Sequence, residues 1–338
     1  MPCRRLTRRA NWSPRSTDRY AALTPEQLDA LRRQLPAFNS GAERPALLDT
    51  LCEFYSIDFH ARMPGVSHDC GTLPSGDYTL AVHRWLVPEA RANLLLMHGY
   101  FDHTGLFNKM IGWALAHGCN VLMFDLPGHG LSSGDPAAID DFAQYSLAMD
   151  NALNNIDMPS LPWWAMGQST GCAAITDYAR RYDWPFDGAV LLAPLVRPRA
   201  WGLVKLGHTV AGPFRDSVPR TFTDNSTDTA FLKFIREDPL QAHATSLRWV
   251  GALRRWLRGL KLADLGVGPV FVVQGDDDGT VDWRYNLTAI EKLYPGTHVL
   301  MLEGAGHQLA NESVAYREQY LAAVRGYLAH QGILLPAD

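Results

Sequence analysis

A serine flanked by glycines is the residue of this chain best suited to nucleophilic chemistry. Gly167-Gln168-Ser169-Thr170-Gly171 matches the pattern G-x-S-x-G, follows the apolar run Trp163–Met166 and opens a segment of helical periodicity. A sharp strand-to-helix turn of this kind exposes the serine hydroxyl, and the two glycines leave room for the crossing strand and helix. The pattern therefore predicts Ser169 as a nucleophile that attacks an acyl carbonyl.

A serine hydroxyl needs a general base, and His307 has the position expected of one. It ends the small-residue loop Glu303-Gly304-Ala305-Gly306-His307, directly after a predicted strand at Thr297–Leu302. Open α/β sheets build their sites at the carboxyl ends of strands. We interpret His98 as a residue that orders its own loop. Most of the remaining histidines are expected at the surface, among them His60, His68, His83, His117, His129, His208, His243 and His330.

The base in turn needs a carboxylate to orient it, and three stand together between the serine and His307. Asp276, Asp277 and Asp278 follow a predicted strand at Pro269–Gln274. Their position alone does not choose among them. Asp282, a few residues later, is instead expected to cap the next helix.

Backbone N–H groups for a developing oxyanion are predicted at Tyr100 and Thr170. His98-Gly99-Tyr100 follows the apolar run Leu94–Met97, and Thr170 opens the helix behind the nucleophile. Two such donors stabilise a transition state by roughly 3 kcal/mol each. Asp102 and His103, which come next in this loop, are expected to brace it or to line the pocket.

These residues require a sheet that brings distant strand ends together. Between residues 92 and 193, short apolar runs alternate with segments of helical periodicity, which predicts a doubly wound, mostly parallel α/β sheet. Residues 24–60 are predicted to be mostly helical, beginning at the capping pattern Thr24-Pro25-Glu26-Gln27. His68–Leu73 and Asp77–Val87 are predicted to form a hairpin that turns at Pro74-Ser75-Gly76.

The alternation stops between residues 197 and 264 and then resumes. We therefore predict a helical cap, residues 197–264, inserted into one domain that spans residues 23–338. Its clearest element is a helix over Ser246–Lys261, with Trp249 and Trp256 on one side. The strong basic charge of this helix indicates either a solvated face or a lid that meets an anionic lipid surface. The basic residues are Arg248, Arg254, Arg255, Arg258 and Lys261.

The motifs, taken in chain order, resemble those of the monoacylglycerol lipase and lysophospholipase group of α/β hydrolases, also grouped with serine aminopeptidase-like enzymes. They are His98-Gly99-Tyr100, Asp125–Ser132, the serine motif, Gly275-x-x-Asp278 and Gly306-His307. The resemblance implies the α/β-hydrolase fold and favours Asp278 as the acid, three residues after the strand-end glycine. Asp125–Ser132 is interpreted as a structural loop. Gln168 departs from the group, which commonly carries His there, and residues 1–60 match no part of it.

The resemblance also implies the reaction: hydrolysis of a carboxylic ester, of monoacylglycerol or lysophospholipid type, through an acyl-enzyme on Ser169. No cofactor or metal is expected. The same three residues also suit a thioesterase, an acyltransferase or a peptidase, so these alternatives stay open. A binding module without turnover is disfavoured, because serine, acid and histidine are all present in the right order.

Composition and charge limit the partners. The chain has 338 residues and a net charge of −4, so no nucleic acid is expected, and a small ester or lipid is the predicted partner. Residues 1–22 are predicted to be a disordered basic tail, because the first 20 positions hold six arginines. This tail and the basic helix leave open a weak peripheral contact with an anionic membrane.

Cysteine usage points to a reducing compartment. The five cysteines are odd in number and irregular in spacing, which argues against a disulfide framework. No apolar run follows the N-terminal arginines, so no signal peptide is expected. A cytoplasmic location is the resulting prediction.

Overall fold

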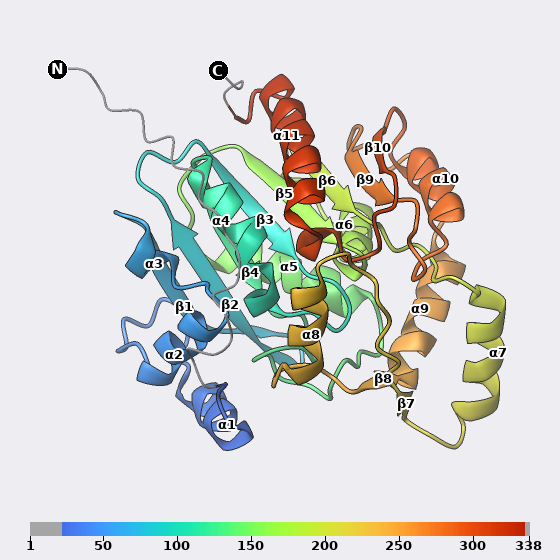
Figure 1. The fold of residues 1–338 in the computed structure, drawn as a ribbon, viewed down its shortest axis with the longest axis horizontal. Helices are drawn as coiled ribbons and strands as arrows, with labels where there is room; N and C mark the ends of the chain where they lie inside the picture. Colours follow the sequence, from blue (N-terminus) through green and yellow to red (C-terminus); the bar gives the residue numbers. More distant parts are fainter. Residues whose placement is uncertain (1–21, 335–338) are drawn as a thin grey trace.

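The computed structural model describes residues 22–334, which fold around one eight-stranded sheet (Figure 1). Its strands are β1 (Ser67–Ser75), β2 (Tyr78–Leu86), β3 (Ala92–Met97), β4 (Cys119–Phe124), β5 (Trp163–Gln168), β6 (Gly188–Leu192), β9 (Phe271–Gly275) and β10 (His298–Leu302). They lie in the order β1-β2-β4-β3-β5-β6-β9-β10. β2 pairs antiparallel with β1 and β4, and all other neighbours pair parallel. The predicted doubly wound, mostly parallel sheet is confirmed.

The central strands are buried on both faces, which explains their continuous apolar runs. In β3, Leu94 and Leu96 pack into the core on one face of the sheet, and Leu95 and Met97 pack into the core on the other. Fully burying a side chain of this size stabilises the fold by roughly 1.5–3 kcal/mol. Because β3, β5, β6, β9 and β10 run parallel, their carboxyl ends meet at one edge of the sheet.

Helices cover both faces of the sheet (Figure 1). One face carries α4 (Asn108–Ala116) and α11 (Val314–His330), joined by the N-terminal helices α1 (Pro25–Gln34), α2 (Ala46–Phe54) and α3 (Phe59–Arg62). The other face carries α5 (Ala143–Asn155), α6 (Thr170–Arg181) and α10 (Trp283–Leu293). Two short 3-10 turns, η2 (Thr104–Phe107) and η3 (Leu309–Asn311), follow the loops after β3 and β10.

The N-terminal lead-in begins at the predicted cap and then departs slightly from prediction. Thr24 and Gln27 form a capping box, each side chain accepting from the other's backbone N–H. The hairpin turn, however, lies later than expected: β1 continues through Pro74 to Ser75, and Gly76 turns the chain with a φ of +57°. Pro74 is tolerated in β1 because this is an edge strand, where a missing N–H costs little.

The inserted segment, residues 197–264, lies between β6 and β9 and adds no strand to the large sheet. It contains α7 (Trp201–Ala211), β7 (Ser217–Pro219), α8 (Thr229–Glu237), β8 (Ala244–Ser246) and α9 (Leu247–Gly259). The predicted basic helix is α9: the Ser246 side chain caps it, and Trp249 and Trp256 are buried in the core. β7 and β8 pair antiparallel. This small sheet was not expected, since three-residue strands leave no readable alternation.

The surface assignment of the histidines is wrong for His68, His83 and His129, which are buried. The ring nitrogens His68 Nε2 and His83 Nδ1 lie 3.0 Å apart, and His129 Nδ1 hydrogen-bonds the Pro127 carbonyl at 2.9 Å. Partners inside the fold replace water for the bonded ring nitrogens, whereas His129 Nε2 has no hydrogen-bond partner among the described residues. Sequence position alone does not reveal those partners.

Some sequence predictions concern residues that lie outside the described range. The basic tail, residues 1–22, and Cys3 fall almost wholly beyond it. Among the described residues, Cys52, Cys70, Cys119 and Cys172 form no disulfide. Within residues 22–334, no helix has the combined length and apolar character required to cross a bilayer.

Candidate active site

Ser169 lies at a tight turn between β5 and α6. Its φ is +52°, a left-handed value that few non-glycine residues adopt, and its N–H donates to the Leu192 carbonyl at 2.9 Å. The flanking glycines are required by contact. A Cβ on Gly171 would lie 2.4 Å from the Met97 carbonyl oxygen, and one on Gly167 would lie 2.8 Å from the Cys172 nitrogen. The strand-to-helix setting predicted for this motif is present.

His307 reaches the serine from the loop after β10. Its Nε2 lies 2.9 Å from Ser169 Oγ, and its Nδ1 lies 2.7 Å from Asp278 Oδ2. These distances let Nδ1–H donate to the carboxylate while Nε2 accepts from the serine hydroxyl. The structure thus brings together the three residues predicted from distant parts of the sequence.

The three adjacent aspartates have different surroundings. Asp276 and Asp277 are exposed, and Asp276 accepts from the Gly304 N–H. Asp278 is buried and turns towards His307. The loops after β9 and β10 touch at Gly275, where a Cβ would lie 2.2 Å from the Ala305 carbonyl oxygen. This close approach puts Asp278 beside the histidine.

Asp278 is held in its charged form. Burial alone would raise its pKa, but the attraction of His307 and the hydrogen bond between them lower it, and so do the backbone N–H groups of Val281 and Thr280. The net effect is a pKa below the ordinary value. An ionised carboxylate at this position is what an adjacent imidazolium requires for stabilisation.

The two predicted oxyanion donors, Tyr100 and Thr170, come from different loops. Thr170 is the first residue of α6, so its N–H has no acceptor within the helix. Tyr100 lies in the loop after β3, which Gly171 contacts at Met97 and His98. Among the described residues, no backbone hydrogen bond outside helices and strands is donated by either N–H. Neither N–H is engaged in such a bond, as an oxyanion donor requires.

The loop carrying Tyr100 is braced by buried polar side chains, as expected for His98 and Asp125–Ser132. His98 Nε2 accepts from the Leu126 N–H at 2.8 Å, and its Nδ1 bonds the Gly99 carbonyl. Burial lowers the pKa of His98 to about 3, so the ring is neutral. Asp125 accepts from the Thr104 and Leu131 N–H groups, both at 2.7 Å.

Asp102 and His103, whose roles were left open, both brace the loop. Asp102 Oδ1 accepts from Gln308 Nε2 at 3.0 Å, which links this loop to the residue after His307. His103 Nε2 lies 2.9 Å from Asp238 Oδ2 in the inserted segment. Asp102 Oδ2 is buried and has no hydrogen-bond partner among the described residues.

Gln168 is a site residue whose role the sequence reasoning missed. It is fully buried; its Nε2 donates to the His307 carbonyl at 2.9 Å, and its Oε1 accepts from the Ala310 N–H at 3.2 Å. The residue before the nucleophile thus holds the loop that carries the base. Its departure from the His common in similar enzymes was the available signal.

The inserted segment contacts loops on both sides of the candidate site. Ser169 is 7% exposed and His307 4% exposed. The Tyr100 ring stacks on Trp249 of α9 with centroids 4.0 Å apart, and the Tyr100 hydroxyl accepts from the Ser246 N–H. The Asn225 carbonyl accepts from the Gln308 N–H at 2.9 Å. Contacts from this segment therefore reach two loops: the loop after β3 that carries Tyr100, here called the oxyanion loop, and the loop after β10 that carries His307, here called the base loop.

Comparison with known proteins identifies the class. Residues 88–314 match the family described as serine aminopeptidase, S33, which is more than half of the chain. The chain belongs to this family.

Individual relatives are distant. The chain is 25% identical over 245 residues to mouse α/β hydrolase domain-containing protein 17C, covering 72% of this chain but 62% of that protein, so it spans about three fifths of that relative. It is 25% identical to a monoacylglycerol lipase of Mycolicibacterium smegmatis (66% of this chain, 84% of the lipase). It is 24% identical to phospholipase YtpA of Bacillus subtilis (72% and 97%).

Solved structures agree on the fold. A soluble variant of the Saccharomyces cerevisiae monoglyceride lipase, in complex with a substrate analog, aligns with a TM-score of 0.67 at 19% identity. That alignment covers 78% of this chain and 95% of the lipase. The likeness establishes the α/β-hydrolase fold.

Proposed function

We propose that the chain is a serine hydrolase that cleaves carboxylic esters of lipid type by an acyl-enzyme mechanism on Ser169. The observation that carries the proposal is the continuous Ser169–His307–Asp278 chain, with contacts of 2.9 and 2.7 Å. Each side chain comes from the end of a different strand, and all three are buried together. That arrangement matches the roles of nucleophile, base and orienting acid.

In the proposed reaction, Ser169 Oγ attacks the ester carbonyl while its proton passes to His307 Nε2. Asp278 stabilises the imidazolium and keeps Nδ1 protonated. The carbonyl oxygen becomes an oxyanion bound by the Tyr100 and Thr170 N–H groups. His307 then protonates the leaving alkoxide, which departs as the alcohol. Water, deprotonated by His307, attacks the acyl-enzyme and releases the acid and free Ser169.

The lipid-like substrate rests on two supports. Relatives in the comparisons are named monoacylglycerol lipase and phospholipase. In addition, Asp102 Oδ2 is buried in the oxyanion loop without a hydrogen-bond partner, so a substrate hydroxyl that reached it when the covering residues move would supply the missing bond. A leaving alcohol with further hydroxyl groups would satisfy this oxygen.

We further propose that the inserted segment acts as a cap. Substrate cannot reach a serine that is 7% exposed unless the covering residues move. Trp249 and Asn225, which contact the oxyanion and base loops, belong to this segment. Cap opening is therefore part of the proposed catalytic cycle.

The cytoplasmic location stays a prediction, which cell fractionation would test.

The test uses the purified full chain and p-nitrophenyl esters of graded acyl length, compared with monoacylglycerol. We expect Ser169→Ala to lower kcat by a factor on the order of a thousand or more. Ser160→Ala, which changes an exposed serine before β5, should retain wild-type turnover. Turnover of thioester or amide substrates alone would replace the ester proposal. Equal turnover by wild type and Ser169→Ala would contradict the assigned nucleophile.

A further inference from the structure

Helix α7 has an unusual surface for a helix of a folded domain. None of its residues is buried. Leu203, Leu206, Val210 and the following Phe214 are 71, 60, 64 and 85% exposed, and they recur every three or four residues. They therefore form one continuous apolar face turned to solvent. No other helix among the described residues exposes so many large apolar side chains.

The opposite side of α7 rests on the protein. Trp201 and Val204 pack against the core that α9 also joins. His208 accepts a contact of 2.7 Å from Arg254 of α9, which also donates to Thr209 and to the Lys205 carbonyl. α7 lies beside α9 at the edge of the molecule (Figure 1), while Leu203, Leu206, Val210 and Phe214 stay mostly exposed.

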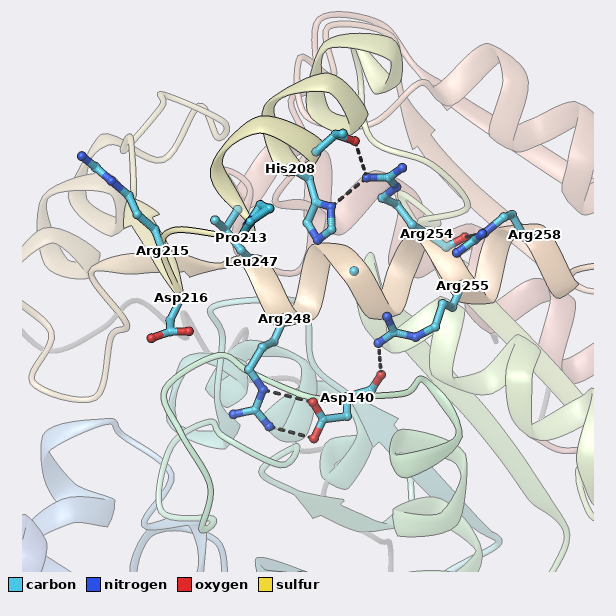
Figure 2. Close-up of a pocket in the computed structure, with 13 residues that line it drawn as sticks. Asp140, His208, Pro213, Arg215, Asp216, Leu247, Arg248, Arg254, Arg255 and Arg258 are labelled. Carbon is cyan, nitrogen blue, oxygen red and sulfur yellow. Dashed lines mark hydrogen bonds and ion pairs between the residues drawn. The ribbon is translucent and has the colours of Figure 1, made fainter.

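A cationic groove of about 590 Å³ lies beside α7 (Figure 2). Figure 2 shows Arg254 of α9 reaching towards His208 of α7, and Arg248 and Arg255 of α9 pointing the other way, towards Asp140. Five arginines and two aspartates line it: Arg215, Arg248, Arg254, Arg255, Arg258, Asp140 and Asp216. Neither Ser169 nor His307 lines this groove, so it is separate from the candidate active site.

Most of this positive charge is not compensated. Arg248 forms ion pairs with Asp135 and Asp140. Among the described residues, Arg215, Arg254, Arg255 and Arg258 form no ion pair with a carboxylate. Arg255 and Arg258 donate only to backbone carbonyls. Five guanidinium groups against the two carboxylates of Asp140 and Asp216 leave the groove with an excess of positive charge, which suits it to phosphate groups.

We propose that the α7 apolar face and the adjoining cationic groove dock the protein on an anionic phospholipid bilayer. An exposed apolar patch marks an interaction site, and an interfacial helix buries its apolar side below the level of the lipid headgroups. Basic side chains along such a helix then lie at headgroup depth, where anionic phosphates attract them. A soluble polyanion would satisfy the arginines but leave the α7 face in water, so the two features together favour the bilayer.

The docking surface is connected to the candidate active site through α9. α7 rests on α9, and Trp249 of α9 stacks on Tyr100 of the oxyanion loop. Docking would therefore hold the inserted segment, the proposed cap, against the lipid phase. The docking itself does not depend on the proposed hydrolysis, and it can be measured in a chain that lacks the nucleophile.

The experiment is flotation of the full chain with vesicles of phosphatidylcholine alone and vesicles with equal parts of phosphatidylglycerol. One variant combines Leu203→Ser, Leu206→Ser and Phe214→Ser; another combines Arg215→Gln, Arg255→Gln and Arg258→Gln. Matched controls are Val299→Ser with Val314→Ser, and Arg33→Gln with Arg91→Gln and Lys292→Gln, all at exposed positions away from the groove. Circular dichroism and hydrolysis of a short soluble ester verify folding.

We expect wild type to float with the anionic vesicles in a salt-sensitive manner, and Ser169→Ala to float equally well. Each removed arginine should weaken binding about fivefold, and the serine variant should lose binding as well, while both controls float like wild type. Loss in the arginine variant alone would indicate adsorption by charge without insertion of the α7 apolar face, and would overturn the proposal. Equal flotation of all variants, or none by wild type, would also overturn it.

Discussion

Neighbouring residues hold the side chains of the candidate site in the positions that the proposed chemistry requires. Ser169 occupies a strained backbone conformation, which costs of order 1–3 kcal/mol and persists only because the surroundings enforce it. The enforcing contacts are backbone approaches at Gly167 and Gly171. His307 is fixed from behind by Gln168, which bonds the histidine's own carbonyl. Gln168 thus positions His307.

Replacing Gln168 tests this positioning role. We expect Gln168→Ala to lower kcat about tenfold to a hundredfold with little change in KM, because the base loop loses its bonds at His307 and Ala310. Gln168→His, the residue common in similar enzymes, should recover much of the activity. Steady-state kinetics on a soluble ester measure both, with Gln144→Ala as the control. An unchanged kcat in Gln168→Ala would show that Gln168 does not position His307.

Separate elements meet at a buried polar junction beside the site. The Tyr55 hydroxyl, after α2, donates to Asp238 Oδ1 at 2.5 Å, and His103 approaches the other oxygen of Asp238 at 2.9 Å. Burial would lower the pKa of His103, but Asp238 outweighs it and raises the pKa. Burial would raise the pKa of Asp238, but His103 lowers it. One ion pair thus joins the N-terminal helices, the oxyanion loop and the inserted segment.

Breaking this junction should destabilise the fold. Asp238→Asn leaves His103 buried without its carboxylate, which we expect to cost about 3–5 kcal/mol in urea unfolding. Asp224→Asn, which removes an exposed pair with Arg236, should cost less than about 1 kcal/mol.

The junction also has a defined pH window. The raised pKa of His103 means that its contribution is complete below about pH 6.5 and is lost as pH rises through that pKa. The lowered pKa of Asp238 means that its contribution is complete above about pH 4 and is lost on acidification. The difference in the free energy of unfolding between wild type and Asp238→Asn should therefore be largest between these two pH values. A difference independent of pH would contradict the ion pair.

The molecule as a whole buries several neutral histidines on different elements. Burial lowers the pKa of His83 and His129 to about 4 and that of His98 to about 3. The unfolded chain titrates near pH 6.5, so it binds protons that the native state refuses. Stability gained from these groups is therefore lost as pH falls below about 6.5.

We expect acidification to lower the free energy of unfolding at pH values well above those at which carboxylates titrate. Each such histidine should lower the free energy of unfolding by about 2 kcal/mol between pH 7 and pH 5. Urea denaturation at several pH values gives the slope of the free energy of unfolding against pH. This slope should be shallower in His83→Gln and unchanged in His330→Gln, which changes an exposed residue. Identical slopes in wild type and His83→Gln would refute this account, whatever the stability of the variant at pH 7.

Local patterns of the sequence determined the architecture and the residues at its strand ends. Apolar runs such as Leu94–Met97 report burial directly, and parallel strands must end at one edge. Ser169 and His307 could therefore be chosen from the elements that precede them. The helix under Trp249 and Trp256 was readable for the same reason, because its periodicity is local.

Only the tertiary structure decided what depends on contacts between distant segments. Position in the chain left Asp276, Asp277 and Asp278 equal and only the resemblance favoured Asp278; its contact with His307 depends on the approach of two loops at Gly275. The burial of His68 and His83, the bond from Gln168 to His307, and the solvent-facing side of α7 likewise depend on neighbours far along the chain. A side chain's type and spacing state what it can do, but its partners exist only once the chain has packed.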